Sequence, residues 1–424
     1  MTLPMLHAGF KGYPTHAAPL PLSDVGQQDW RLLRGDLPLP LAVLRRSALE
    51  HNLSWMREFC AQRGISLAPH GKTTMSPQLY HRQLAAGAWA ISFATVYQAG
   101  IGVSHGVRRV LIANQVLQAA DLDGLAHLLS TCEGLEAMFL VDSLEQIEQI
   151  ERWRAQRTSP VVFSVLLELG LAGQRTGCRS HEQALAVAQR VHSSPALRLV
   201  GIESYEGGLV TCDHEHDAQA VAALMQRLQA VAQACDAAGW FECDEVLITA
   251  GGSALFDLVA RDLRPRLSRP ARGVLRSGCY LTHDHVQYRQ LLRCVGERLQ
   301  LARTLEPALE VLSVVQSVAE PGLAHLSMGK RDVSYDRDLP VPLWRAEQGD
   351  TQTRSVPSHW QVVALNDQHA HLRYDAARPS HEHPRVGHIV GSGISHPCTT
   401  FDKWRWMPVV DEDYRVVDAI TIHC

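Results

Sequence analysis

The chain has 424 residues, 46% of them hydrophobic and 20% charged, and carries a formal net charge of −4. This length accommodates two domains, and the composition excludes a disordered chain. The near-balanced charge gives no electrostatic footprint for nucleic acid or an anionic membrane, so neither is expected as a partner.

The N-terminus and the cysteines indicate a reduced, cytosolic setting. Residues 1–16 contain no sustained apolar stretch, which argues against a signal peptide, and no run approaches the length of a membrane span. The ten cysteines are scattered and form no Cys-x-x-Cys pair, a pattern that does not suit a disulfide scaffold.

One strand and one helix are predicted before the main repeat. Leu41–Leu44 is a short apolar run, and Ser47-x-x-Glu50 has the spacing of a capping box. We therefore predict a helix from Ser47 to Arg63. A second capping box, Ser143-Leu-Glu-Gln146, predicts the start of a later helix.

Eight apolar runs alternate with helical segments between residues 65 and 285, as strands buried on both faces of a parallel sheet do. The runs are Ser66–Pro69, Ala90–Phe93, Arg109–Ala113, Ala137–Val141, Val161–Leu167, Leu199–Ser204, Glu245–Thr249 and Gly273–Arg276. Eight strand–helix repeats predict an α/β fold of the (β/α)8 barrel type. A doubly wound open sheet is the alternative, disfavoured because no Gly-x-Gly-x-x-Gly motif follows the first strand.

The pattern changes after residue 295, where helical periodicity fades. Leu309–Ala319, His359–Leu365 and Val386–Val390 are predicted strands between Gly, Pro and Asp turns. We expect a barrel domain over residues 41–290 and a β-rich domain over residues 291–424. The N-terminal segment, residues 1–40, is expected to pack on the β-rich domain.

The first barrel strand ends in His70-Gly71-Lys72-Thr73. The carboxyl ends of barrel strands carry active sites, and a lysine in a partly desolvated mouth can form an imine. By itself, Lys72 is more simply interpreted as a surface lysine after a Pro-His turn.

Two glycine-containing loops make that simple interpretation weaker. Gly251-Gly252-Ser253 follows the seventh strand, and Gly278-Cys279-Tyr280 follows the eighth. The loops after these two strands commonly hold a phosphate through backbone N–H groups. An ordinary Gly-Gly-Ser turn is the alternative, and Cys178 and Cys279 beside such loops are interpreted as packing residues.

His396-Pro-Cys398 is a candidate metal pair. An imidazole and a thiolate two residues apart project the same way from an extended segment and can chelate Zn²⁺. Alone, such a pair is more often packing than metal. Three other histidine pairs are interpreted as solvated loops: His214-Glu-His216, His283-Asp-His285 and His381-Glu-His383.

Several motifs, in their order along the chain, resemble the D-threonine aldolase and D-serine dehydratase family. They are Pro69-His-Gly-Lys72-Thr, Leu84-Ala-Ala-Gly87-Ala, Ile112-Ala-Asn114-Gln115-Val, Tyr205-Glu-Gly, Thr249-Ala-Gly-Gly-Ser253, Arg276-Ser-Gly-Cys-Tyr280 and Ser395-His-Pro-Cys398. The resemblance covers the chain from residue 38 and implies an alanine-racemase-like barrel followed by a β-domain. It also implies pyridoxal phosphate as cofactor and a homodimer.

The same resemblance implies roles for individual residues. Lys72 would carry the cofactor as a Schiff base, with His70 beside it, Arg175 near the ring oxygen and Tyr205 along the ring. The phosphate would be held by Gly251, Gly252, Ser253, Gly278 and Tyr280. The sequence Glu168-Leu-Gly-Leu-Ala-Gly-Gln before Arg175 departs from the family's usual acidic-residue-plus-glycine pattern.

His396 and Cys398 would bind a divalent metal, for which their donors favour zinc. His-x-Cys resembles the dehydratase branch and His-x-Asp the aldolase branch. We therefore expect elimination, in which D-serine gives pyruvate and ammonia. Retro-aldol cleavage to glycine and an aldehyde, racemisation, and a non-catalytic pyridoxal-phosphate-binding protein are the alternatives.

Overall fold

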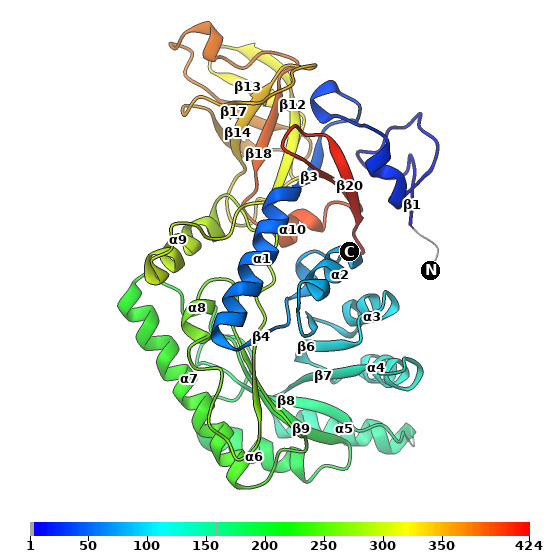
Figure 1. Ribbon diagram of the computed structural model, residues 1–424, viewed down its shortest axis with the longest axis vertical. Coiled ribbons are helices and arrows are strands. Elements are labelled where there is room, and N and C mark those ends of the chain that lie inside the picture. Colours follow the sequence, from blue (N-terminus) through cyan, green and yellow to red (C-terminus); the bar gives the residue numbers. More distant parts are fainter. Residues whose placement is uncertain (1–3, 158) are drawn as a thin grey trace.

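Eight parallel strands form the lower part of the molecule (Figure 1), and each overlaps one of the eight predicted apolar runs. The structure is a computed structural model that describes residues 4–157 and 159–424. The strands are β4 (Ser66–Leu67), β5 (Ile91–Phe93), β6 (Arg109–Gln115), β7 (Glu136–Val141), β8 (Phe163–Leu169), β9 (Leu197–Ser204), β10 (Val246–Ala250) and β11 (Ala271–Leu275).

The strand order confirms the predicted barrel. The sheet runs β4-β11-β10-β9-β8-β7-β6-β5, which is sequence order with the last strand beside the first. The two end strands meet through a parallel bridge between His70 and Ser92, and the N–H of Ser92 donates to the Pro69 carbonyl at 2.9 Å. Because the edges meet, the doubly wound open sheet is excluded.

Burial on both faces explains why the barrel strands are nearly continuous apolar runs. One set of side chains forms a small separate cluster within the sheet, and the alternate set packs against the surrounding helices. The separate cluster consists of Ala68, Ala90, Leu111, Met138, Leu140, Leu166, Val200, Leu247 and Val274.

The helices begin close to where the sequence predicts. Ser143 Oγ accepts from the Gln146 N–H at 3.4 Å, which confirms that cap. The Ser47 capping box is wrong, because the helix already begins at Arg46 and has no side-chain cap. The helices are α1 (Arg46–Arg63), α2 (Pro77–Ala85), α3 (Val96–Ser104), α4 (Ala119–Thr131), α5 (Leu144–Arg157), α6 (His181–His192), α7 (His214–Ala237), α8 (Phe256–Val259), α9 (Gln287–Leu299) and α10 (Pro397–Phe401).

The upper part of Figure 1 is a largely antiparallel sheet in the order β15-β14-β18-β12-β13-β17-β16, with β3, β19 and β20 attached beside it. Its strands are β3 (Leu41–Arg45), β12 (Leu309–Glu320), β13 (Leu323–Leu326), β14 (Val341–Ala346), β15 (Arg354–Ser355), β16 (Gln361–Leu365), β17 (Ala370–Arg373), β18 (Ile389–Gly393), β19 (Trp406–Val410) and β20 (Val416–Thr421). Of the three strands predicted here, two lie where expected. The third, β18, begins three residues late because Gly387, at φ +92°, and the bond from His388 N–H to Arg385 O form a turn.

Strand β3 precedes the barrel in sequence but pairs with β12 and β19 of the upper sheet. The expected barrel range 41–290 thus includes a strand whose ladder bonds all go to the other sheet. The N-terminal segment also lies against that sheet. Trp30 O accepts from the Val416 N–H at 2.8 Å, and the Leu32 N–H donates to Tyr414 O at 3.1 Å. The segment's short elements are β1 (Met5–Leu6), β2 (Leu20–Pro21), and the 3-10 turns η1 (Leu22–Gln27) and η2 (Leu32–Arg34).

Residues His283-Asp-His285, interpreted from sequence as a solvated loop, are largely buried beneath the upper sheet, where the His285 N–H donates to Ile394 O at 3.0 Å. In the part of the chain that the structure describes, no helix is both long and apolar enough to span a bilayer.

Candidate active site

Lys72 lies at the carboxyl rim of the barrel, in the 3-10 turn η3 (Gly71–Thr73) directly after β4. The turn is closed by a bond from the Thr73 N–H to the His70 carbonyl at 3.2 Å. Gly71 is required for close packing, since a Cβ there would lie 2.8 Å from the Ile91 and Phe93 side chains. Lys72 is half-buried, unlike the fully exposed lysine of an ordinary surface turn.

His70 presents an unsatisfied nitrogen beside this lysine. Its Nδ1 atom is buried and has no hydrogen-bond partner in residues 4–157 and 159–424. Burial, followed by the charges of Lys72 and Arg276, lowers the pKa of His70 well below its ordinary value. The ring is therefore neutral, and an orphaned buried nitrogen of this kind indicates a missing ligand atom.

A cavity of about 280 Å³ opens at the ends of β8, β9 and β10. It is lined by Arg175, Tyr205 and Ser253 from the barrel and by Arg337 from the β-rich domain. The Arg175 guanidinium carbon lies 4.7 Å from the centroid of the Tyr205 ring. Among the described residues neither arginine forms an ion pair and Ser253 makes no hydrogen bond, so the cavity is suited to an anionic occupant.

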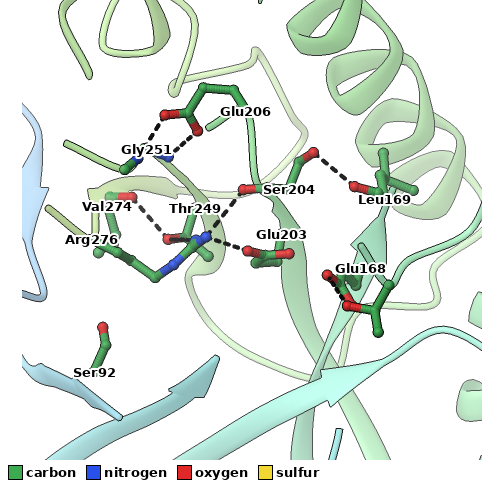
Figure 2. A network of polar contacts seen from close by, with 12 residues as sticks. Ser92, Glu168, Leu169, Glu203, Ser204, Glu206, Thr249, Gly251, Val274 and Arg276 are labelled. Carbon is green, nitrogen blue, oxygen red and sulfur yellow. Dashed lines mark hydrogen bonds and ion pairs between the residues drawn. The ribbon is translucent and has the colours of Figure 1, made fainter. Parts of the chain in front are cut away.

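A buried ionic network lies at the ends of β8, β9, β10 and β11, inside the mouth (Figure 2). Arg276 pairs with the Glu203 carboxylate and donates to Thr249 Oγ1 at 2.7 Å and to Ser204 O at 3.1 Å. Burial raises the pKa of Glu203 to about 8 against the opposing charge of Arg276, and its Oε2 atom has no partner.

Glu168 is a second buried acid near this network. It accepts from Thr176 Oγ1 at 2.9 Å and from Gln115, while burial raises its pKa. Sequence reasoning missed the roles of Glu168, Glu203 and Arg276. A usable signal was present, because an ionisable residue inside an otherwise apolar strand is a functional-site candidate.

The predicted phosphate residues are not all brought to the cavity. Gly251, at φ +100°, and Gly252 donate their N–H groups to the Glu206 carboxylate, at 2.9 and 2.6 Å. The buried Tyr280 hydroxyl accepts from Gln83 Nε2 at 3.1 Å. Only Ser253 among them lines the 280 Å³ cavity with a polar side chain.

Gly278 has a packing role in this structure. A Cβ at this position would lie 2.7 Å from His70 Cβ and 2.8 Å from Thr73 Oγ1. The glycine therefore lets the loop after β11 touch the turn that carries Lys72.

The His-x-Cys pair of the β-rich domain lies against the same turn, because α10 follows β18 and sits between the two domains (Figure 1). Cys398 Sγ is 3.7 Å from Thr73 Oγ1 and 3.9 Å from Cys279 Sγ. Cys279, interpreted from sequence as a packing residue, thus contacts the candidate metal thiol. The structure brings Cys398 into contact with Thr73, the neighbour of Lys72, which is 325 positions away in the chain.

His396 is held by a carboxylate that the sequence analysis did not include. Its Nδ1 lies 2.6 Å from Asp336 Oδ2, and Asp336 Oδ1 accepts from Thr399 Oγ1 at 2.7 Å. Burial raises the pKa of Asp336, but the bonds from Thr399 and His396 bring it below its ordinary value. Nε2 of His396 is left for another ligand, although the described residues contain no group of three or more His, Cys, Asp or Glu side chains arranged to hold a metal.

Two family models match the chain in the order of its two domains. The alanine racemase N-terminal domain matches residues 44–268, and the putative serine dehydratase domain matches residues 308–410. The first match covers more than half of the chain and includes every barrel strand except β11.

Two curated relatives resemble the chain over most of its length. The D-threonine aldolase of Arthrobacter sp. is 26% identical, with 88% of each chain covered. The D-threo-3-hydroxyaspartate dehydratase of Delftia sp. strain HT23 is also 26% identical, over 80% of this chain and 85% of the relative. Among solved structures, the D-threonine aldolase of Filomicrobium marinum superposes with a TM-score of 0.75 at 22% identity, covering 91% of this chain and 95% of that one.

Proposed function

The chain belongs to the alanine racemase N-terminal domain family, and from this premise we propose that it is a dehydratase of small D-configured β-hydroxy amino acids. Its close relatives are pyridoxal-phosphate-dependent lyases, an aldolase and a dehydratase among them. The observation that carries the proposal is the contact of Cys398 with the turn of Lys72, which puts a candidate metal thiol beside a candidate cofactor lysine. The thiol at position 398 supports elimination, because His-x-Cys resembles the dehydratase branch.

The residues at the rim fit pyridoxal phosphate. Lys72 would hold it through the ε-amine, Tyr205 and Arg175 would lie along its ring, and Ser253 would face its phosphate. The orphaned Nδ1 of His70 and the unpaired polar groups of the 280 Å³ cavity support this fit. Once bound, the cofactor supplies an electron sink that makes the α-proton of the substrate acidic.

The protein's own groups would then divide the work. Lys72 Nζ would take the α-proton, and the neutral state of His70 favours this because it adds no positive charge beside the amine. Arg337 would bind a substrate carboxylate oxygen in the cavity. The covering β-rich domain would limit water at the mouth, where unwanted hydrolysis would otherwise compete.

The donors at positions 396 and 398 fit a zinc ion. An imidazole oriented by a carboxylate and a thiolate are donors that Zn²⁺ prefers, and two protein ligands leave positions for substrate and water. A metal there would supply Lewis acidity to the departing β-hydroxyl. We also propose, from the family resemblance, that two chains pair as a homodimer, which light scattering on the holoprotein tests.

Product analysis tests the proposal. The holoenzyme is offered D-serine, D-threonine and D-threo-3-hydroxyaspartate, with and without Zn²⁺. A 2-oxo acid with ammonia supports the dehydratase, whereas glycine with an aldehyde assigns the chain to the aldolases. Lys72→Ala should remove the adduct that borohydride traps on the wild-type protein, and an unchanged adduct would mean that another residue holds the cofactor.

A further inference from the structure

Glu206 makes a contact that the proposed function does not explain. It lies two residues after the end of β9, and its carboxylate accepts from the backbone N–H groups of Gly251 at 2.9 Å and Gly252 at 2.6 Å (Figure 2). The residue is fully buried, and no lysine, arginine or histidine in the described chain lies within ion-pair distance of it. The two amides are therefore the contacts that stabilise this charge inside the protein.

The glycine turn is held on its other side as well. Ser277, in the loop after β11, donates its hydroxyl to the Gly252 carbonyl at 2.5 Å. The Tyr205 ring also lies close, since a Cβ on Gly252 would stand 3.0 Å from its Cε2 atom. Side chains that follow β9 and β11 thus fix the turn after β10 from two directions.

Ser253, the next residue, has the opposite character. In residues 4–157 and 159–424, neither its N–H nor its hydroxyl has a hydrogen-bond partner, and the residue lines the cavity with Arg175, Tyr205 and Arg337. A polar residue left unpaired directly after two glycines whose N–H groups are both paired indicates that the turn is arranged to present Ser253.

We infer that Glu206 is a positioning residue. It takes the Gly251 and Gly252 N–H groups permanently and so directs Ser253, rather than the two glycines, toward the cofactor phosphate. This inference rests on the proposed function, since it presumes that a phosphate enters the cavity. The glycine motif alone suggests that the Gly251 and Gly252 N–H groups donate to the phosphate, whereas here that role falls to Ser253.

In the alternative interpretation, Glu206 accepts from the two N–H groups only until the phosphate displaces it. The two interpretations predict changes in cofactor affinity of opposite sign. If Glu206 positions the turn, Glu206→Gln loses one of two charge-assisted bonds and the cofactor binds more weakly. If Glu206 competes with the phosphate, the same change frees the amides and the cofactor binds more tightly.

The test is a titration of the apoprotein with pyridoxal phosphate, followed by absorbance, with the ³¹P chemical shift of the bound phosphate as a second readout. Glu206→Gln should raise the Kd roughly 10- to 100-fold, the range for a lost hydrogen bond to a charged group. Asp217→Asn is the matched control, because Asp217 is an equally buried acid that accepts from the backbone N–H groups of Thr211 and Cys212, at 2.9 and 3.1 Å. It should leave the Kd and the ³¹P shift unchanged.

Ser253→Ala is the second variant. Ser253 is a small residue at the cavity wall, so its truncation should disturb folding less than the loss of a buried carboxylate. Its Kd should rise about 3- to 10-fold, as for one neutral hydrogen bond, and its ³¹P shift should move. An unchanged or lowered Kd for Glu206→Gln, or a ³¹P shift insensitive to both changes, would overturn the inference. Wild-type protein that binds no pyridoxal phosphate would instead refute the proposed function.

Discussion

At the scale of single residues, unpaired charge is the strongest guide to chemistry in this molecule. Most buried ions have a partner, as Arg276 has Glu203 and Arg298 has Asp257. Arg337 is exposed rather than buried, lines the cavity from the β-rich domain, and has no carboxylate within ion-pair distance in the described chain. A cation left open toward a cavity is positioned for a ligand anion.

Arg337→Ala should therefore weaken substrate binding more than chemistry. We expect KM for D-threo-3-hydroxyaspartate to rise about 5- to 10-fold with little change in kcat, as for one lost charge-assisted hydrogen bond. Steady-state kinetics on that substrate and on D-serine measure the effect. Arg331→Ala is the control, because Arg331 is exposed, pairs with Asp367 and does not line the cavity. A fall in kcat of the same size, with KM unchanged, would contradict a role of Arg337 in substrate binding.

Asp336 is the residue through which His396 can be tested. Asp336→Asn keeps the size of the side chain but removes the charge that fixes the imidazole, so zinc affinity should fall about 10- to 100-fold. Competition with a chromophoric chelator measures that affinity without any assay of turnover. Asp338→Asn is a nearby control that leaves the bond to His396 intact. Unchanged zinc affinity in Asp336→Asn would show that the carboxylate does not orient the ligand.

At the scale of elements, the segment after β11 shows how burial overrides local composition. His283 and His285 flank Asp284 in a polar-looking stretch, yet His283 and Asp284 are buried and His285 is half-buried. Burial lowers the pKa of His283 to about 4 and that of His285 to about 3, and it raises the pKa of Asp284 to about 7. These three side chains are thus neutral in the folded protein over a pH range in which they carry charge in the unfolded chain.

These shifts predict a pH-dependent stability. Between pH 7 and pH 5 the unfolded chain takes up a proton at position 283, while the folded state does not. The contribution of His283 to the free energy of unfolding is therefore fully present above about pH 6.5 and is lost as the pH falls toward 4. Asp284 acts in the opposite direction, because its folded form takes up the proton first. His283→Asn suits the site, since asparagine tolerates the φ of +48° found there.

His283→Asn should reduce the stability lost between pH 7 and pH 5 by roughly 2 kcal/mol relative to wild type. Urea unfolding at the two pH values measures it. His127→Asn, an exposed position on α4, controls for the loss of one imidazole. Parallel pH profiles for His283→Asn and wild type would contradict the buried, neutral state of the segment.

At the scale of the whole molecule, the two domains are joined by more than the connecting chain. Gln78 on α2 exchanges hydrogen bonds with Thr421 on β20, at 3.1 Å in both directions, and Arg82 pairs with Asp418. Strand β3 pairs within the upper sheet and leads directly into α1 on the barrel. We therefore expect the barrel and the β-rich domain to unfold together.

Calorimetry should give one unfolding transition, and Gln78→Ala should lower the free energy of unfolding by about 1 to 3 kcal/mol through the unpaired groups left on β20. Gln189→Ala on the outer side of α6 is a control for a glutamine in a helix. Two separate transitions, or a Gln78→Ala protein as stable as wild type, would show that the domains unfold independently.

The amino-acid sequence by itself determined the eight barrel strands and the position of Lys72 at the end of the first. Both follow from local periodicity, because a strand buried on two faces must be apolar over its length wherever its neighbours lie. The sequence also marked His396 and Cys398 as a candidate metal pair by their spacing, but the extended segment expected there is wrong, because Cys398 lies in the first turn of α10 and His396 is its N-cap.

Tertiary structure decided what those residues contact. The contacts of Glu206 with Gly251, of Glu203 with Arg276 and of Cys398 with Thr73 join positions far apart in the chain. A carboxylate has no sequence-encoded partner, because any amide or cation that the closed barrel brings within reach can satisfy it. Tertiary pairing also put β3 in the upper sheet, and packing between the domains buried His283, which local composition had assigned to solvent.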